Sequence, residues 1–266
     1  MPTTAVPGAN LHYELVGSGP PLLLINGTGS DLRKKPNVLD GPVVRHFTVL
    51  TYEHRGLGRS RATDAEHQPT MADFAADGLA LADVVGWDRF ALLGISFGGM
   101  VAQHVALAGG DRIERSVLAC TSAGGAGGAS APLHEIYPLT TPERVARAVA
   151  YSDLRTADDA ARRGRTIELV RAGVATDDPA TYPGLARQLE ARRRHDAWDR
   201  LPELRAPTLV AAGRHDGIAP LTNARALADR IPGATLRVFE GGHVFFLEDR
   251  TAWPAMIGFL RGETTT

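Results

Sequence analysis

The chain has 266 residues, a formal net charge of −1 and one cysteine, Cys120, and 44% of its residues are hydrophobic. This composition predicts a globular protein of one large or two small domains, and it excludes a disordered chain, a collagen and a coiled coil. The balanced charge gives no electrostatic case for nucleic acid or an anionic membrane as partner. One cysteine excludes an internal disulfide and a cysteine-rich zinc site. Residues 1–10 show no secretory signal, and no apolar run approaches the roughly 20 residues of a membrane span. We therefore expect a cytoplasmic protein without a metal or a cofactor.

Short apolar runs alternate with helical patterns along the first 120 residues. Residues 11–16 alternate between apolar and polar side chains, as a half-exposed strand does. Helices are predicted after Thr70, where Asp73 completes a capping box, and over residues 100–108. Strands alternating with helices predict βαβ units and a mostly parallel sheet with helices on both faces. Strands buried on both faces are predicted at residues 22–25, 47–52, 90–95 and 115–120.

The pattern changes in the middle of the chain, where residues 121–131 are small and glycine-rich and residues 132–200 carry only helical patterns. We therefore assign residues 1–131 and 201–266 to an α/β core that is interrupted by a helical insertion. Because ligands bind beyond the carboxyl ends of parallel strands, we expect residues 132–200 to cover the site as a cap. The core pattern resumes with strands at 208–212 and 235–239, a helix after Pro220 and a closing helix at 253–260.

The sharpest local signal is the segment Gly94-Ile95-Ser96-Phe97-Gly98, which lies where the strand at 90–95 meets the next helix. In that context Gly-x-Ser-x-Gly predicts a nucleophile elbow, a strained turn that exposes the serine oxygen above the sheet. Side chains at positions 94 and 98 would clash in such a turn, so glycine is needed at both. The alternative is a glycine-rich turn that only packs a helix on a strand.

A nucleophilic serine needs a base, and the base needs an orienting carboxylate. Of the nine histidines, His243 follows the last strand at the same sheet edge as Ser96, after two glycines that let the loop bend. Asp216 follows the strand at 208–212 at that edge too. The alternatives are a solvated loop histidine and a helix-capping aspartate. The chain order Ser96, Asp216, His243 is the order of nucleophile, acid and histidine in one particular scaffold.

Taken together, these motifs resemble the α/β-hydrolase fold family with a helical cap, over residues 22–260. The segment Glu53-His54-Arg55-Gly56-Leu57-Gly58-Arg59-Ser60 is similar to the family's D-x-R-G-x-G-x-S loop, with glutamate in place of aspartate. Residues 100–103 resemble the enol-lactonase-like and esterase-like branches. The resemblance implies an eight-stranded sheet and supports the assignment of residues 132–200 to a cap.

An oxyanion hole needs two backbone N–H groups. One is expected from Phe97, which directly follows the nucleophile. By family position, the second comes from Thr28 in the loop Asn26-Gly27-Thr28-Gly29. Asn26 stands where the family usually has histidine, and its amide can still hold the loop by hydrogen bonds. The alternative for this loop is a plain turn between a strand and a helix.

The sequence thus predicts a serine hydrolase that cleaves a small-molecule ester or lactone through an acyl-enzyme on Ser96. Gly27, Tyr137 and Val244 are the predicted substrate-binding residues, although Tyr137 could belong to the cap's own core. Residues 192–194, all arginine, are interpreted as a solvated helix face. Two alternatives stay open. One is carbon–carbon, amide or cofactor-free oxygen or peroxide chemistry on the same scaffold, and the other is a non-catalytic ligand-binding protein.

Overall fold

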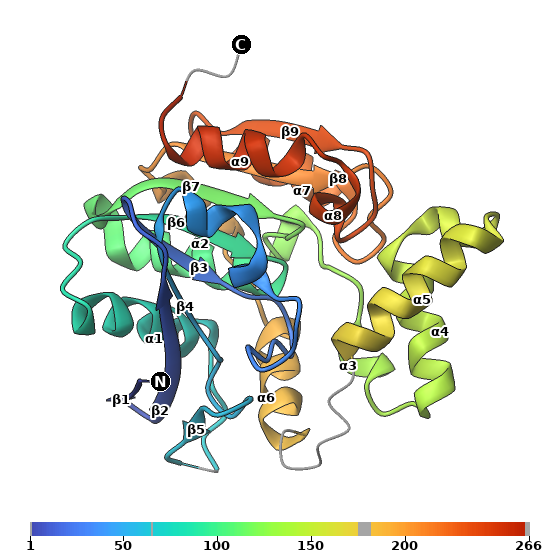
Figure 1. The fold of residues 1–266 in the computed structure, drawn as a ribbon, viewed down its shortest axis with the longest axis horizontal. Helices are drawn as coiled ribbons and strands as arrows, with labels where there is room; N and C mark the ends of the chain where they lie inside the picture. Colours follow the sequence, from blue (N-terminus) through green and yellow to red (C-terminus); the bar gives the residue numbers. More distant parts are fainter. Residues whose placement is uncertain (1, 65, 175–181, 264–266) are drawn as a thin grey trace.

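A computed structural model of the chain describes residues 2–64, 66–174 and 182–263, and a nine-stranded sheet forms its centre (Figure 1). The strands are β1 (Thr3–Val6), β2 (Ala9–Val16), β3 (Pro21–Ile25), β4 (Thr48–Tyr52), β5 (Arg61–Ala62), β6 (Phe90–Ile95), β7 (Ile113–Ala119), β8 (Thr208–Gly213) and β9 (Thr235–Phe239). Eight of them follow the order β1-β2-β4-β3-β6-β7-β8-β9, and the two-residue β5 pairs with β2. All neighbours from β4 to β9 are parallel, whereas β2 is antiparallel to β1, β4 and β5. The predicted α/β fold with a mostly parallel sheet is confirmed.

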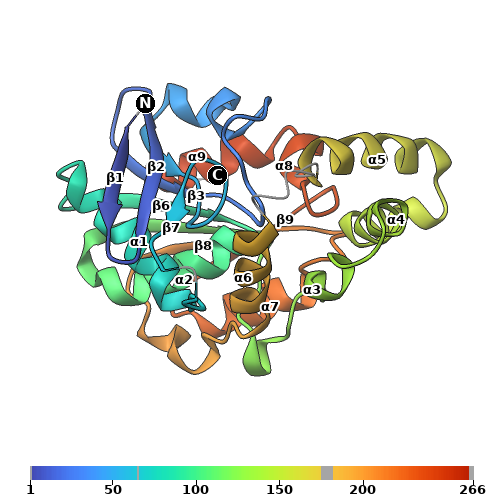
Figure 2. The same ribbon diagram turned by 90° about the horizontal axis from the view of Figure 1, so that it is seen from below.

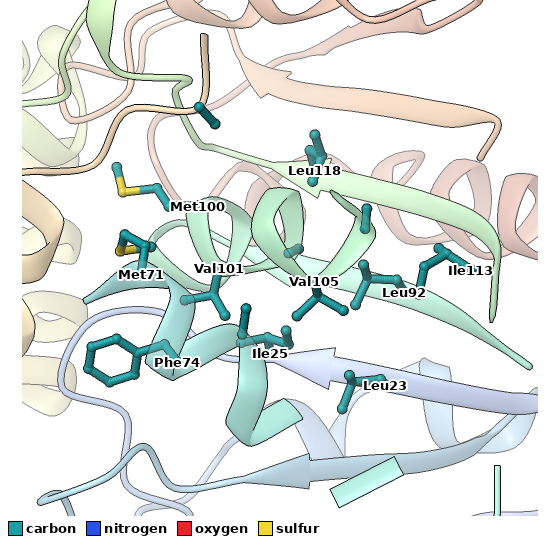
Figure 3. Close-up of a cluster of buried hydrophobic side chains, with 14 of the residues drawn as sticks. Leu23, Ile25, Met71, Phe74, Leu92, Met100, Val101, Val105, Ile113 and Leu118 are labelled. Carbon is teal, nitrogen blue, oxygen red and sulfur yellow. The ribbon is translucent and has the colours of Figure 1, made fainter. Parts of the chain in front are cut away.

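Two hydrophobic clusters fill the two faces of the sheet, because successive side chains of a strand point to opposite sides. Leu23 of β3 lies in one cluster and Leu22 in the other. Figure 3 shows Ile25 between Phe74 and Leu23 in the first cluster, with Val101 and Val105 beside them. The second cluster packs the other face against the C-terminal helix. The helices of the core are α1 (Met71–Val84), α2 (Phe97–Gly109), α7 (Leu221–Arg230), α8 (Phe245–Glu248) and α9 (Ala252–Leu260).

The described part of residues 132–200 is mainly helical, with one isolated bridge between Asp196 and Gly124. In both views α4 and α5 extend away from the sheet, whereas α6 lies closer to it (Figures 1 and 2). No helix in the described part of the chain is long and apolar enough to cross a membrane. The helices of this segment are α3 (Leu133–Ile136), α4 (Thr141–Ser152), α5 (Ala160–Val174) and α6 (Tyr182–Arg193). Short 3-10 helices cover Val38–Asp40, Pro42–Arg45, Gly110–Arg112, Gly125–Gly127, Leu154–Ala157 and Trp198–Glu203.

Local sequence explains where the core helices begin. The Thr70 hydroxyl accepts the Asp73 N–H at 3.3 Å and the Asp73 carboxylate accepts the Thr70 N–H at 2.7 Å, so the expected capping box is present. Pro220 is the N-cap of α7. The helix predicted from residue 100 begins at Phe97, because the elbow turn itself is the helix start. The prediction also missed β1 and β5, both at the antiparallel side of the sheet.

A buried pair of histidines joins the helical segment to the core. His104 of α2 and His195, just after α6, meet with 3.2 Å between Nε2 and Nδ1. The other ring nitrogen of His195 lies 3.0 Å from the Ser122 carbonyl and donates to it, because a carbonyl can only accept. Burial lowers the pKa of His104 to about 4 and that of His195 to about 3. Both rings are therefore neutral at pH 7, and His104 donates to His195.

We expect the free energy of unfolding to fall as the pH is lowered from 6.5, the usual pKa of histidine, toward 4. Below pH 6.5 only the unfolded chain binds these protons, which costs about 1.4 kcal/mol per pH unit for each histidine. Urea unfolding at a series of pH values measures this slope. Replacing His195 by Leu should reduce the slope by about one histidine's share. The matched change His67→Gln, at an exposed histidine, should leave it unchanged. Equal slopes in His195→Leu and the wild type would contradict this account.

Candidate active site

Ser96 occupies a strained turn between β6 and α2. Its φ is 56° and its ψ is −116°, a conformation that side-chain-bearing residues rarely adopt. The Ser96 N–H donates to the Ala119 carbonyl of the neighbouring β7 at 2.9 Å. A Cβ atom at Gly98 would lie 2.0 Å from the Ile25 carbonyl oxygen, and one at Gly94 would lie 2.4 Å from the Gly98 carbonyl oxygen. The glycines are therefore required because backbone passes directly against them.

The structure brings Ser96, His243 and Asp216 together at the carboxyl edge of the sheet. His243 Nε2 lies 2.9 Å from Ser96 Oγ, and His243 Nδ1 lies 2.8 Å from Asp216 Oδ2. Asp216 is buried, and its other oxygen accepts the N–H groups of Ile218 at 2.7 Å and Ala219 at 2.9 Å. A carboxylate can only accept, so Nδ1 carries the proton and Nε2 is free to accept the serine hydroxyl. This arrangement can deprotonate Ser96 and leave the developing imidazolium beside a carboxylate.

The end of α4 holds the two loops that carry Asp216 and His243. The Ser152 carbonyl accepts the His243 N–H at 2.6 Å, and the Tyr151 carbonyl accepts the Gly217 N–H at 2.9 Å. A Cβ atom at Gly242 would lie 2.2 Å from the Ser152 oxygen, so the contact requires glycine there. The last carbonyls of a helix lack partners within the helix. Here these two accept from the loops and fix the position of the imidazole.

The loop after β3 passes directly beside the nucleophile. A Cβ atom at Gly27 would lie 3.4 Å from the Ser96 Cβ. The side-chain amide of Asn26 donates to Thr51 Oγ1 at 2.7 Å. The backbone carbonyl of Asn26 accepts from His54 Nε2 at 3.0 Å. Burial lowers the pKa of His54 to about 4, so this ring is neutral at pH 7 and keeps its donor. Asn26 thus holds the loop through its amide, as expected for the residue that replaces histidine.

Two backbone N–H groups, those of Thr28 and Phe97, lie in the two segments that meet at Ser96. Within the described residues, neither the Thr28 N–H nor the Phe97 N–H has a hydrogen-bond acceptor. Thr28 lines the pocket described below, and Phe97 is the first residue of α2. A helix N-terminus favours negative charge, because its first N–H groups point outward along the helix dipole. One group comes from each of the two segments in which the sequence predicts oxyanion-hole donors.

Glu53, which replaces the family's aspartate, is a buried anchor for the loop that follows β4. Its carboxylate accepts the Leu32 N–H at 3.0 Å and Arg59 Nη2 at 2.8 Å. The longer side chain reaches Gly58, where a Cβ atom would lie 2.4 Å from Glu53 Oε2 and where φ is +55°. Glycine at position 58 therefore lets the Glu53 carboxylate lie directly against the backbone of the loop. In this position Glu53 holds the loop by hydrogen bonds.

A cavity of about 310 Å³ opens onto Ser96 and His243. All three predicted substrate-binding residues, Gly27, Tyr137 and Val244, line it. Arg144 is the one permanently charged side chain among the described lining residues, and its guanidinium lies 5.2 Å from the centre of the Tyr137 ring. The remaining lining is mainly apolar and comes from Ile95, Leu133, Ile136, Val170, Leu185, Leu189, Ile218 and Phe246. This lining suits a small organic ligand with an uncharged body.

Other features of the described chain do not add a second site. A larger groove of about 760 Å³ lies between α4 and α5, and its described lining contains none of the predicted catalytic residues. The described residues hold no group of three or more His, Cys, Asp or Glu side chains that could bind a metal ion.

The interpretation of residues 192–194 as one solvated face is wrong for Arg192. This side chain is buried and donates to the Ala131 carbonyl at 2.7 Å, and burial lowers its pKa to about 10. Arg193 and Arg194 do face solvent and pair with Glu190. Consecutive helical residues are about 100° apart, so three in a row turn through roughly half the helix circumference and cannot all face outward. The helical period was therefore the available signal that at least one of these three arginines turns inward.

The sequence analysis also missed that Cys120 lines the cavity. Cys120, the last residue of the strand predicted at 115–120, is buried directly after β7 and borders the cavity beside Ser96. Burial, with the Asp216 carboxylate nearby, raises the pKa of its thiol well above the usual value. Its position directly after a strand, at the same edge as Ser96, was the available signal.

Comparison with known proteins places the chain in a family. It belongs to the alpha/beta hydrolase fold family, whose model matches residues 20–250. The enol-lactonase from Burkholderia xenovorans LB400 matches it with a TM-score of 0.81 and 26% identity, over 98% of this chain and 100% of that chain. A hydrolase from Pseudomonas aeruginosa PA01 has a TM-score of 0.76 and 30% identity, over 98% of each chain. The candidate carbamate hydrolase RutD of Azorhizobium caulinodans is 28% identical over 253 residues, 92% of each protein. The family and these relatives support an enzyme of the α/β-hydrolase type with a small-molecule substrate.

The close approach at Gly98 predicts that a side chain there lowers the stability of the protein. A second glycine, Gly164, provides the control. Gly98→Ala should lower the melting temperature, because its Cβ would lie 2.0 Å from a backbone oxygen and the cost of overpacking is typically about 1–3 kcal/mol. Gly164→Ala, in α5, meets nothing within 4 Å and should raise stability by roughly 0.5–1 kcal/mol. Thermal melts followed by circular dichroism compare the two variants. A Gly98→Ala protein as stable as the wild type would refute the close contact.

Proposed function

We propose that the protein is a serine hydrolase that cleaves a carboxylic ester or a lactone of a small molecule through an acyl-enzyme on Ser96. The observation that carries the proposal is the hydrogen-bonded chain from Ser96 Oγ through His243 to Asp216, facing a mainly apolar cavity. A serine hydroxyl is a weak nucleophile until a neighbouring base removes its proton, and this chain supplies that base together with its orienting carboxylate.

The geometry supports a two-step reaction. His243 Nε2 takes the proton from Ser96 Oγ as that oxygen attacks the carbonyl carbon, and it then gives the proton to the leaving alcohol oxygen. Asp216 keeps the proton on Nδ1 and stabilises the imidazolium in between. In the second step His243 takes a proton from water as the water oxygen attacks the acyl carbon. The bond from that carbon to Ser96 Oγ then breaks, His243 returns the proton to Oγ, and the carboxylic acid leaves. The buried carboxylate cannot rotate away, because the two backbone N–H groups that it accepts hold one oxygen.

The oxyanion of each tetrahedral intermediate is assigned to the N–H groups of Thr28 and Phe97. Both lack a partner within the described residues, and they come from two segments that meet at Ser96. Donors already in place stabilise charge where it develops, and removing one such donor typically costs about 10²–10³ in kcat. The N-terminus of α2 adds a favourable field at the same point.

Residues 132–200 are assigned the role of a cap over this site. Leu133 and Ile136 of α3, Arg144 of α4 and Val170 of α5 all line the cavity that contains Ser96. A segment that supplies so much of the wall selects the acyl group by shape and polarity. Gly27, Tyr137 and Val244 are assigned to substrate binding on the same ground.

A carbamate is the second candidate substrate class. The RutD relative is described as a candidate carbamate hydrolase, and the matching solved structures include an enol-lactonase. Both substrates carry a carbonyl that the same serine and oxyanion donors would engage. An assay panel of a 4-nitrophenyl ester, an enol lactone and a carbamate distinguishes them. Equal inactivity of the wild type on the whole panel, without labelling of Ser96 by an alkyl fluorophosphonate, would overturn the proposed function.

Ser96→Ala and His243→Ala should each lower kcat on 4-nitrophenyl acetate by several powers of ten, and the double variant should be no slower than either one. The two side chains act as one unit, so their losses do not add. Steady-state kinetics of the three variants beside the wild type measure this. Losses that multiply in the double variant would mean that Ser96 and His243 work independently.

Tyr137→Ala should change the order in which acyl groups are preferred. It should alter the rate on an acetyl ester much less, since so small a substrate needs few remote contacts. The control is Leu169→Ala, which removes an exposed apolar side chain of α5 from the same helical segment outside the described cavity lining. Kinetics on a series of acyl lengths, with thermal melts, measure both effects. If Tyr137 is cap core, the melting temperature drops, as expected for a cavity that costs roughly 3–5 kcal/mol, and the ranking stays unchanged.

A further inference from the structure

A hydrogen bond links α6 to the loop that carries Thr28. Gln188 of α6 is fully buried, and its Oε1 accepts the Gly29 N–H at 2.8 Å. The two residues are 159 positions apart in the sequence. Because an N–H can only donate, this bond fixes which end of the side-chain amide faces the loop. The contact therefore joins the helical segment to the residue next to Thr28.

Thr28 stands between two residues that are held from opposite sides. On one side, Asn26 is bonded through its side chain to Thr51 and through its carbonyl to His54. On the other side, Gly29 is bonded to Gln188. A planar peptide leaves only two soft torsions per residue. With both flanks fixed, the direction of the Thr28 N–H follows from where the flanks are held.

The helix that presents Gln188 is itself seated against the core. A Cβ atom at Gly184 would lie 2.0 Å from the Gly56 carbonyl oxygen, so the two backbones touch. Leu185 also lies next to Gly29, within 3.7 Å of where a Cβ atom would be. α6 is thus a fixed support for the loop.

We propose that Gln188 is a positioning residue for the oxyanion hole, which aims the Thr28 N–H at the oxygen of the tetrahedral intermediate. The inference rests on the proposed function, and it gives the helical segment a part in turnover itself as well as in substrate choice. Without the Gln188 oxygen, the Gly29 N–H loses its acceptor and the loop can turn at Thr28. The Phe97 donor, Ser96 and His243 stay in place, so the expected defect is confined to stabilisation of the oxyanion.

The test replaces Gln188 by Met, which has a similar length and no acceptor oxygen, and compares it with Gln68→Met. The control removes the hydrogen bond that the Gln68 side chain donates to the Arg187 carbonyl of α6, away from Thr28. On 4-nitrophenyl acetate, Gln188→Met should lower kcat by about 10- to 100-fold, less than the loss of a whole donor. KM and the pH dependence of kcat/KM should stay near the wild-type values, since His243 is untouched. Labelling of Ser96 by an alkyl fluorophosphonate, whose P=O group occupies the oxyanion hole, should slow in parallel.

Further variants keep the outcome decisive. Gln188→Glu retains an acceptor oxygen at the same reach and should be faster than Gln188→Met. Gln188→Asn keeps the amide but is one methylene shorter, and it replaces the Met variant if that protein does not fold. A folded Met or Asn variant as active as Gln68→Met, or a Glu variant no faster than Met, would overturn the proposal. Failure of the proposed function shows differently, as a wild type that neither hydrolyses the ester nor reacts with the fluorophosphonate.

Discussion

The arrangement of the site depends on one constraint, the close approach of backbone segments around Ser96. The serine keeps its strained φ of 56° because its N–H is bonded to Ala119 and because glycines let the turn press against β3. The register of the parallel strands places the ends of β3, β6, β7 and β8 side by side, with Ile25 opposite Gly94 and Ile95 opposite Ala119. Once the sheet has formed, the pairing of these strands fixes the backbone position of Ser96. The strain is stored by the sheet and exposes the oxygen that the proposed chemistry requires.

The helical segment is bound to the loops around Ser96 at two separate places. The C-terminal end of α4 accepts hydrogen bonds from the loops of Asp216 and His243, and α6 accepts one from the loop of Thr28. One attachment lies on the acid and base side of Ser96 and the other on the oxyanion side. A lid that swung freely would break these bonds at every opening. In the structure, the inner ends of the segment are instead part of the framework around Ser96.

Much of the fold was predictable because it depends on patterns within a few residues. Apolar runs located the parallel strands, and Gly-x-Ser-x-Gly at a strand-to-helix junction located the turn at Ser96. The pairing of Ser96 with His243 followed from topology, since both sit at the carboxyl ends of parallel strands. The antiparallel β1 and the two-residue β5 are short and partly exposed, so they leave little pattern.

The parts that escaped prediction depend on contacts between distant residues. Whether Arg192 or Arg193 turns inward is decided by the surface on which α6 packs, which the helix's own sequence does not encode. The partnership of Gln188 with Gly29 spans 159 residues and involves a backbone group, so no residue type marks it. Glu53 is a further example. The motif that contains it was recognised in the sequence, but the close contact of its carboxylate with Gly58 appears only in the structure.

The uneven attachment of the helical segment has a consequence for how such an enzyme can diversify. Among the described residues, α3 and α5 make no hydrogen bond to the loops of Thr28, Asp216 or His243, yet Leu133, Ile136 and Val170 face the cavity. Mutations that accumulate in α3 and α5 reshape the cavity wall while leaving those three loops in place. Drift in the last turn of α4 or along α6 acts on the reaction centre itself. The segment therefore has one part, α3 and α5, that can change substrate preference, and another part, the end of α4 and α6, in which changes would also disturb the loops around Ser96.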